Sequence, residues 1–183
     1  MFFNCKLTSM IDFVADREIY EKVICGFLRR AERFVWLATS DLKDMYVDSN
    51  GGMVPLLEVL SSLVRKNVEI RLLHAKEPGK AFRRDFDRYP NLIKGMERVL
   101  CPRVHLKAVI VDGVIAYSGS ANITGAGMGA KSVDKRNFES GFITDESAII
   151  DKITEQFDSI WRGSRCGSCK RKEYCSDYKD LLG

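Results

Sequence analysis

The sequence predicts an α/β fold built around a mixed β-sheet. In the first half of the chain, helical patterns alternate with short apolar runs, an order typical of parallel strands joined by helices. In the second half, Asp112-Gly113 lies between two apolar runs, which is a strong signal for a tight antiparallel hairpin. Because 45% of the 183 residues are hydrophobic, we expect one domain with a sizeable core.

The first half supplies helices and strands in alternation. Apolar side chains recur at helical spacing in residues 16–33 and 53–65, which predicts two amphipathic helices. Residues 34–39 form a continuous apolar run, typical of a strand buried on both faces, and residues 68–74 predict a second strand. Residues 41–52 are polar, acidic and glycine-containing, so we expect a loop between the first strand and the second helix.

Residues 75–103 form a basic section with aromatic side chains in it. Phe82, Phe86 and Tyr89 recur at helical spacing among the lysines and arginines. Two interpretations are open. The section is either a surface helix that buries its aromatic rings, or a surface that faces nucleic acid. The net charge of +4 is modest, so the position of the basic residues is more informative than their number.

The second half predicts four strands, two of them joined as a hairpin, and a closing helix. Residues 97–101 are typical of a short strand, and residues 104–111 of a main one. The Asp-Gly turn returns the chain along residues 114–118, and residues 137–144 form a last strand. The apolar stripe in residues 145–162 predicts a closing helix.

Four polar residues interrupt this core-like region. His105 and Lys107 are two residues apart on the predicted strand 104–111 and should share one of its faces. Ser120 and Asn122 follow the returning strand and can lie beside them. An ammonium group, a hydroxyl, a carboxamide and an imidazole on one small surface suit an anion with tetrahedral oxygens.

These residues occur in a specific order that resembles a known signature. The pattern His-x-Lys-x4-Asp, followed closely by Gly-Ser-x-Asn, is similar to that of the phospholipase D superfamily. Its residues are His105, Lys107, Asp112, Gly119, Ser120 and Asn122. The resemblance covers residues 15–162 and implies a mixed sheet flanked by helices on both faces.

The resemblance also implies a reaction, the hydrolysis of a phosphodiester without a catalytic metal. His105 would attack phosphorus to form a phosphohistidine, and a second histidine would protonate the leaving oxygen. Lys107 and Asn122 would hold the phosphate oxygens, and Ser120 would offer a neutral hydrogen bond beside them.

Two carboxylates are candidates for orienting the His105 ring. Asp112 belongs to the motif, but an aspartate before glycine is also the ordinary residue of a hairpin turn, and we expect this role to be its main one. In the resembling family, an acid shortly after Gly-Ser-x-Asn hydrogen-bonds the nucleophilic ring. Glu139 occupies that place, and we expect it to orient His105.

The family's active site takes two copies of the motif, and this chain has one. It is similar to the single-motif branch of small bacterial endonucleases and mitochondrial-type members, which implies a homodimer with one shared site. The leading prediction is therefore a nuclease that acts on DNA or RNA. The alternatives are a phospholipid hydrolase or transferase, and a nucleic-acid-binding protein without turnover.

Residues 163–183 form a basic, cysteine-containing tail after the predicted catalytic domain, residues 1–162. Three of the chain's six cysteines are close together in it: Cys166, Cys169 and Cys175. This crowding predicts a metal centre, either structural zinc or an iron–sulfur cluster, and the spacing resembles part of the iron–sulfur motifs of some nucleases. The candidates for a fourth ligand are Cys101, Cys25, Cys5 and His74.

Two further observations concern location and the second histidine. No apolar run reaches the roughly 20 residues that a membrane-spanning helix needs, and residues 1–13 lack the continuous apolar core of a signal peptide. With the clustered cysteines, this predicts a cytoplasmic protein. His74 ends a predicted strand, where a packed or solvated role is commoner than a functional one.

Overall fold

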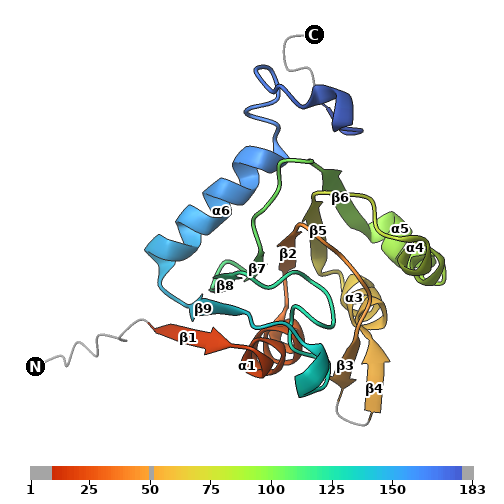
Figure 1. The fold of residues 1–183 in the computed structure, drawn as a ribbon, viewed down its shortest axis with the longest axis vertical. Helices are drawn as coiled ribbons and strands as arrows, with labels where there is room; N and C mark the ends of the chain where they lie inside the picture. The colour runs from red at the N-terminus through yellow and green to blue at the C-terminus, as the bar shows by residue number, and fades with distance from the viewer. Residues whose placement is uncertain (1–9, 50–51, 179–183) are drawn as a thin grey trace, which may run out of the picture.

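The computed structural model of the chain describes residues 10–49 and 52–178 (Figure 1). Seven strands of this described part form one mixed sheet, which confirms the predicted fold class. In spatial order the strands are β1 (Ile11–Ala15), β9 (Ser140–Thr144), β8 (Ile115–Gly119), β7 (Ala108–Val111), β2 (Phe34–Thr39), β5 (Glu69–His74) and β6 (Met96–Leu100).

The sheet combines a parallel part with an antiparallel part. β2, β5 and β6 are parallel, as the alternation of helices and strands predicts. From β2 through β7, β8 and β9 to β1, every neighbouring pair is antiparallel. The hairpin between β7 and β8 turns at Asp112 and Gly113, which both have positive φ, and this confirms the expected turn.

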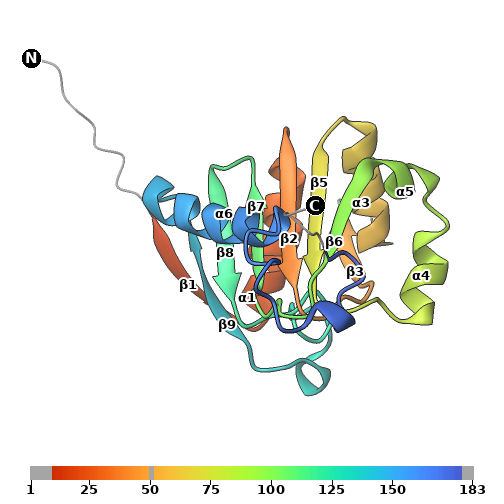
Figure 2. The ribbon, with the colours of Figure 1, turned by 90° about the horizontal axis from the view of Figure 1, so that it is seen from above.

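Helices cover both faces of the sheet, and Figure 2 shows α6 in front of the strands and α1 and α3 behind them. One continuous helical stretch precedes β2, and its middle part is wound as a π-helix. In chain order the helices are α1 (Arg17–Ile19), the π-helix η1 (Tyr20–Phe27), α2 (Leu28–Arg30), α3 (Leu56–Arg65), α4 (Lys80–Phe86), α5 (Pro90–Gly95) and α6 (Ser147–Trp161).

Each face of β2 packs into a different core, which explains its continuous apolar sequence. Val35 and Leu37 lie in the core shared with η1 and α3. Trp36 and Ala38 lie on the opposite face, in the core covered by α6. There the Trp36 ring stacks on Phe157 of α6 with centroids 5.1 Å apart. Because Phe157 is fully buried, its replacement by alanine should cost about 3–5 kcal/mol.

The basic section contains two short helices, α4 and α5. Phe82 and Phe86 of α4 are buried in the core and stack on each other, with centroids 6.2 Å apart. The aromatic spacing therefore reflects packing, and Arg83 and Arg84 of the same helix are exposed. The short 3-10 helix η2 (Val133–Lys135) precedes β9.

The expected loop 41–52 is wrong in its second half, because the strands of a small hairpin lie there. β3 (Tyr46–Ser49) pairs with β4 (Gly52–Pro55), and α3 accordingly begins at Leu56. The Tyr20 hydroxyl fixes the hairpin to η1: it donates to the Tyr46 carbonyl at 3.1 Å and accepts from the Asp48 amide at 2.8 Å. A contact so distant in sequence leaves no local pattern.

Two further strands depart from the sequence pattern. The predicted strand 104–111 is wrong over its first four residues, since β7 begins at Ala108. The chain turns before it, where the Val104 amide donates to the Cys101 carbonyl at 2.9 Å. β1 was not predicted, because its apolar Ile11 and Phe13 face solvent at the edge of the sheet.

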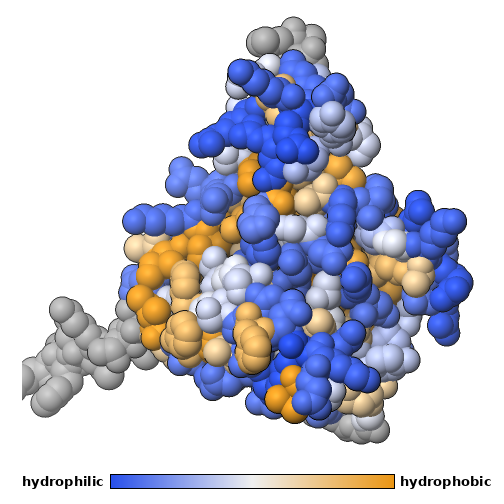
Figure 3. Space-filling view, viewed as in Figure 1, coloured by the Kyte–Doolittle hydropathy of each residue, from blue (hydrophilic) through white to orange (hydrophobic). Residues whose placement is uncertain are grey.

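Beyond α6, the tail lies past one end of the sheet, at the top of Figure 1, and contains the 3-10 helix η3 (Lys172–Tyr174). Hydrophilic side chains dominate its visible surface (Figure 3). Within the described ranges, no helix is both long enough and apolar enough to cross a membrane.

Candidate active site

Three strand ends meet at one edge of the sheet. β2 ends at Thr39 and β5 at His74, and these two residues are paired. β7 runs in the opposite direction and begins at Ala108, the partner of Ala38 on β2. The connection before β7 therefore meets the connection after β2. We call this place the polar edge and define it by Thr39, Ser40, Lys107 and Asn122, which are joined by hydrogen bonds.

Lys107 is the buried cation of the polar edge. Its side chain is largely enclosed, with the residue only 5% exposed. Its ammonium group donates to the Ser40 hydroxyl at 3.1 Å and to the His105 carbonyl at 2.8 Å. Burial lowers the pKa of Lys107, and the negative charge of Glu139 only partly opposes this effect. The fold thus holds an ammonium group with little solvation, which favours a bound anion.

His105 and Lys107 do not share a strand face, contrary to the prediction. Both precede β7, in an irregular connection where the alternation of side chains along a strand does not apply. His105 is exposed, whereas Lys107 is buried. In the described structure no hydrogen bond fixes the His105 ring. The residue is accessible to solvent, and the Lys107 ammonium group donates to its main-chain carbonyl.

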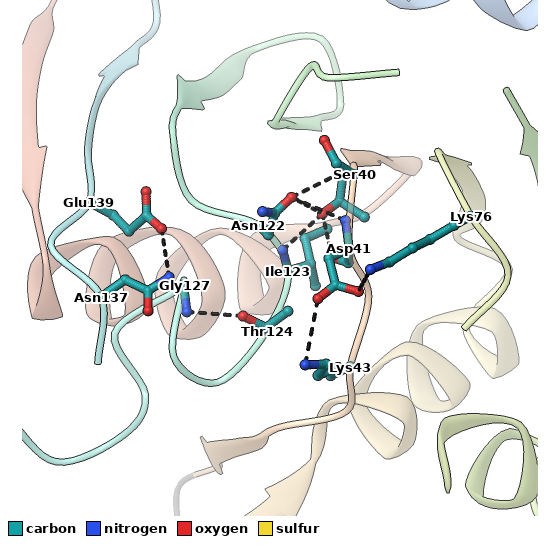
Figure 4. A network of polar contacts seen from close by, with 11 residues as sticks. Ser40, Asp41, Lys43, Lys76, Asn122, Ile123, Thr124, Gly127, Asn137 and Glu139 are labelled. Carbon is teal, nitrogen blue, oxygen red and sulfur yellow. Dashed lines mark hydrogen bonds and ion pairs between the residues drawn. The ribbon is translucent and has the colours of Figure 1, made fainter. Parts of the chain in front are cut away.

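Asn122 connects the hairpin strand β8 to the end of β2. Its side-chain oxygen accepts hydrogen bonds from the Thr39 hydroxyl at 3.2 Å and from the amides of Ser40 and Asp41 at 3.0 and 3.1 Å (Figure 4). Its side-chain nitrogen donates to no residue in the described part of the chain. Three donors thus fix the amide, and its NH₂ group remains available for a ligand oxygen.

Gly119 is required by close packing where β8 meets β9. A Cβ atom at this position would lie 2.3 Å from the Tyr117 hydroxyl and 2.5 Å from the Ser140 carbonyl oxygen. The Gly119 amide donates to the Lys107 carbonyl at 3.2 Å, which places the Gly-Ser-x-Asn segment against the connection that carries Lys107. The glycine of the motif therefore serves packing.

Ser120 and Glu139 form a hydrogen-bonded pair beside the polar edge. The Ser120 hydroxyl donates to the Glu139 carboxylate, which also accepts from the Asn137 side chain at 3.0 Å. The Glu139 main chain is fixed by Asp16, whose carboxylate accepts from the Glu139 amide at 3.1 Å. No hydrogen bond joins Glu139 to His105 among the described residues, so its expected orienting role stays a prediction.

Asp112 lies at the opposite end of β7 and links two elements of the fold. Its carboxylate accepts from the amides of Glu32, Arg33 and Phe34 at 2.8–2.9 Å. Burial acts to raise the pKa of Asp112, but these donors and the Arg33 guanidinium lower it overall. Asp112 thus fixes the start of β2 and forms the turn, and it lies a full strand away from Lys107.

The comparison with protein families agrees with this arrangement. The family model described as "Cardiolipin synthase, PLD-like domain", in which PLD denotes phospholipase D, matches residues 24–161. The chain belongs to the phospholipase D superfamily. It carries the motif of this superfamily once, and its membership indicates a phosphodiesterase. No curated protein sequence matches the chain.

Several solved structures share the fold at low sequence identity. The structure of NucT from Helicobacter pylori matches with a TM-score of 0.61 at 15% identity, over 84% of this chain and 97% of that one. Nuc from Salmonella typhimurium, a phospholipase D family member, matches with a TM-score of 0.62 at 14% identity, over 84% and 95%. TrmBL2, an archaeal chromatin protein whose structure shows a mode of DNA binding, matches with a TM-score of 0.56 at 15% identity, over 87% and 55%.

Charged side chains lie next to the polar edge on the loops after β2 and β5. Asp41 forms ion pairs with Lys76 at 3.0 Å and with Lys43 at 3.6 Å (Figure 4). Burial acts to raise the pKa of Asp41, but the two ammonium groups lower it overall. Both lysines are exposed, and with Asp41 they leave one net positive charge among the three side chains.

His74 is packed, as is usual for a lone histidine at a strand end. It is only 2% exposed, and its Nδ1 lies 2.8 Å from the Lys76 carbonyl oxygen. Its place beside Thr39 puts it at the same end of the sheet as the polar edge. Its burial separates it from the exposed His105.

The cysteines divide into two groups. Cys101, Cys166, Cys169 and Cys175 line one cavity of about 500 Å³ between the tail, α6 and the end of β6. Cys25 lies elsewhere, on η1, where it packs against the core, and Cys5 lies outside the described residues. No group of three or more His, Cys, Asp or Glu side chains in the described chain is arranged to hold a metal ion, so the predicted metal centre is not confirmed.

Sequence reasoning missed Thr39 and Ser40. The Thr39 hydroxyl contacts Asn122 and also accepts a hydrogen bond from the Ile123 amide at 3.0 Å. The Ser40 hydroxyl accepts a hydrogen bond from the Lys107 ammonium group. The sequence did contain an indication of their role, because these two hydroxyl residues lie at the C-terminal end of an apolar strand that was expected to be parallel to the next one. Such strand ends gather functional side chains in α/β folds.

Proposed function

We propose that this protein is a nuclease that hydrolyses phosphodiester bonds of DNA or RNA through a phosphohistidine intermediate. One observation carries the proposal: the accessible His105 ring lies on the same short connection as a buried, hydrogen-bonded Lys107 ammonium group. The free NH₂ group of Asn122 lies at the same edge. A nucleophile beside fixed donors is the arrangement that stabilises a transferring phosphoryl group.

In the proposed first step, a ring nitrogen of His105 forms a bond to phosphorus as the bond to one ester oxygen breaks. Lys107 and Asn122 hold the non-bridging oxygens. An acid gives a proton to the departing oxygen. In the second step, water attacks phosphorus, which releases a phosphomonoester and restores the histidine. No step requires a metal ion.

The need for a proton donor supports a site that is shared by two subunits. The chain contains two histidines, and His74 is buried and lies within hydrogen-bonding distance of the Lys76 carbonyl. A second accessible histidine can therefore come from His105 of another copy. We propose a twofold homodimer in which the two rings face one phosphate, one acting as nucleophile and the other as acid.

Glu139 and Ser120 are proposed as positioning residues. Ser120 and Asn137 fix the Glu139 carboxylate through hydrogen bonds. From this place the carboxylate would accept a hydrogen bond from a His105 ring in the assembled site and select its reactive tautomer. Asp112 has no part in the chemical steps, because its carboxylate is occupied by three amides of the segment before β2.

The charge around the polar edge supports nucleic acid as the substrate. Lys43 and Lys76 lie on the loops beside Asn122 and are exposed. Cations in such positions can neutralise the phosphates on either side of the one being cleaved. A cytoplasmic location stays a prediction from the cysteine distribution.

The first test is a substrate panel in EDTA. It compares single- and double-stranded DNA and RNA, a generic phosphodiester and phospholipid vesicles, with His105→Asn as the control. We expect cleavage of at least one nucleic acid, a loss of about 10⁴-fold or more in the variant, and nucleic-acid affinity within a few-fold of the wild type. Cleavage of lipid alone would reject the nuclease assignment. Salt-sensitive binding of nucleic acid with no cleavage of any substrate would instead support a nucleic-acid-binding protein without turnover.

The second test addresses the shared site by mixing subunits. Wild-type and His105→Asn chains are unfolded together, refolded at varied ratios and assayed. If each site needs two intact copies of His105, activity should follow the square of the wild-type fraction. A linear dependence, or an active monomer in light scattering, would contradict the shared site.

A further inference from the structure

Four cysteines from two separate parts of the chain surround one cavity. Cys101 follows β6 directly, whereas Cys166, Cys169 and Cys175 lie on the tail, and all four line the cavity of about 500 Å³. The tail is fixed to the end of β6 by Asp177, whose carboxylate accepts from the Leu100 amide at 2.7 Å. The Cys175 thiol lies 3.5 Å from the Leu100 carbonyl oxygen, in position to donate to it.

We propose that this cavity holds a four-iron, four-sulfur cluster bound by Cys101, Cys166, Cys169 and Cys175. The proposal is independent of the chemistry at the polar edge, because none of its ligands belongs to that edge. It assigns the cluster a structural role, which is to join the tail to the connection that leads from β6 to His105.

The structure selects the fourth ligand from the candidates of the sequence. His74 is buried, lies within hydrogen-bonding distance of the Lys76 carbonyl and does not line the cavity. Cys25 lies on η1 and packs against the core on one face of the sheet, whereas α6, which covers the other face, lines the cavity. Among the described candidates, Cys101 is the one that lines the same cavity as the three tail cysteines.

The spread of the thiols favours a cluster over a zinc ion. Four sulfurs at about 2.3 Å from one zinc lie roughly 4 Å from one another. In a four-iron cluster each thiolate binds a different iron, so the sulfurs stand around a larger volume. Four cysteines distributed around a cavity fit this second geometry.

The walls of the cavity suit a group with net negative charge. Arg103, Lys152, Arg165 and Arg171 line it together with one carboxylate, Glu155. Four ligating thiolates outweigh the small net positive charge of the iron–sulfide core, and a basic wall offsets part of the cost of enclosing the resulting negative group.

Hydrogen-bond donors also face the cysteines. The Arg103 guanidinium and the Arg171 amide donate to the Cys169 sulfur at 3.8 and 3.5 Å. Tyr178 lines the same cavity, and in the described structure its hydroxyl is buried without a hydrogen-bond partner. Donors to cluster sulfurs are a common means of stabilising such clusters, and the Tyr178 hydroxyl is free to act as one.

The test uses the full-length protein, purified without oxygen. We expect a brown protein with visible absorption and, per chain, four iron and four sulfide ions. Cys101→Ala and Cys169→Ala should each lose the visible absorption and most of the iron. Cys25→Ala, a matched control that removes a half-buried thiol away from the cavity, should retain both.

Circular dichroism separates loss of the cluster from loss of the fold. If a variant fails to fold, the wild-type protein can be bleached with an iron chelator and reconstituted with iron and sulfide. The proposal predicts recovery of the absorption, and failure to recover it would count against the cluster. A colourless protein with one zinc per chain, one without metal, or full iron content in Cys101→Ala would each overturn the proposal.

Discussion

The two ends of the connection 101–107 are held in different ways. At its C-terminal end, the Lys107 ammonium group bonds to Ser40 and to the His105 carbonyl, and the Gly119 amide bonds to the Lys107 carbonyl. At its N-terminal end, the Cys101 amide bonds to the His74 carbonyl at 2.9 Å, but its side chain faces a cavity whose far wall is the tail.

This difference separates the two functions that we propose for the connection, which are binding of the phosphate at Lys107 and attachment of the tail at Cys101. The polar edge is preorganised by contacts within the fold, so each of its side chains should affect the reaction individually. The cysteine cavity joins the tail to the fold by few direct bonds, so its cohesion should depend on the proposed cluster. Substitutions at the two ends should therefore change different measured quantities.

Among substitutions that test this difference between the two ends, the largest effect is expected from Lys107→Met. Methionine keeps much of the apolar stem but removes the charge that we propose binds the phosphate. The kcat/KM should fall by about 10²–10³-fold, as for loss of one preorganised donor in other enzymes. The melting temperature should not fall greatly, because a buried ammonium group is costly to desolvate. A loss of less than tenfold would remove Lys107 from the phosphate-binding role.

The second effect is on stability and is expected from Asp112→Asn, which weakens the link between the β7–β8 turn and the start of β2. One amide oxygen cannot replace two carboxylate oxygens that accept from three backbone amides, so the free energy of unfolding should fall by about 2–3 kcal/mol at neutral pH. Because the pKa of Asp112 is lowered in the fold, its contribution is present above the unfolded pKa of about 4. It is lost as the pH falls through the folded value, so the difference between the two proteins should shrink in acid.

Urea unfolding at neutral and acidic pH measures this change, and kcat of the folded variant completes the test. We expect kcat to stay close to that of the wild type. A large loss of kcat without loss of stability would return Asp112 to the catalytic group and contradict the linking role.

Sequence patterns predicted the parts of the fold whose causes are local. β2 occupies residues 34–39 as expected, because burial on both faces requires a continuous apolar run. The Asp112-Gly113 turn follows from the two positive φ angles that this dipeptide tolerates. The order of the motif also predicts that Lys107 and Asn122 lie together, and in the fold both of them contact Ser40.

The errors arise where contacts distant in sequence decide the structure. The β3–β4 hairpin depends on the hydroxyl of Tyr20, some 26–28 residues before it. The polar start of the expected strand 104–111 is irregular because Lys107 reaches Ser40, 67 residues away. Pairing of this kind depends on the assembled sheet, which periodicity alone cannot represent.

A smaller effect is expected when a contact of the tail is weakened. In Asp177→Asn the carboxylate that accepts from the Leu100 amide becomes a neutral acceptor, and this should weaken attachment of the tail by about 1 kcal/mol. Trypsin should cut faster among the basic residues of the tail, whereas kcat/KM should change less than threefold. A loss of activity comparable to that of Lys107→Met would show that the two ends of the connection 101–107 are coupled, and it would contradict their separate roles.

The smallest and most specific effect is on the alkaline side of the pH profile. Lys107 must be protonated to bind phosphate, and burial lowers its pKa below the ordinary value of 10.5. The kcat/KM, which reports the free enzyme, should therefore fall at a lower pH than an ordinary lysine would require. Because the Glu139 carboxylate raises the pKa of Lys107, Glu139→Gln should move this fall to still lower pH. The pH at which kcat/KM falls can be measured separately from its maximal value. An orienting role of Glu139 would also reduce that maximal value in Glu139→Gln. A fall that moves to higher pH in Glu139→Gln would show that another group titrates, and that the preorganised cation of the polar edge is not Lys107.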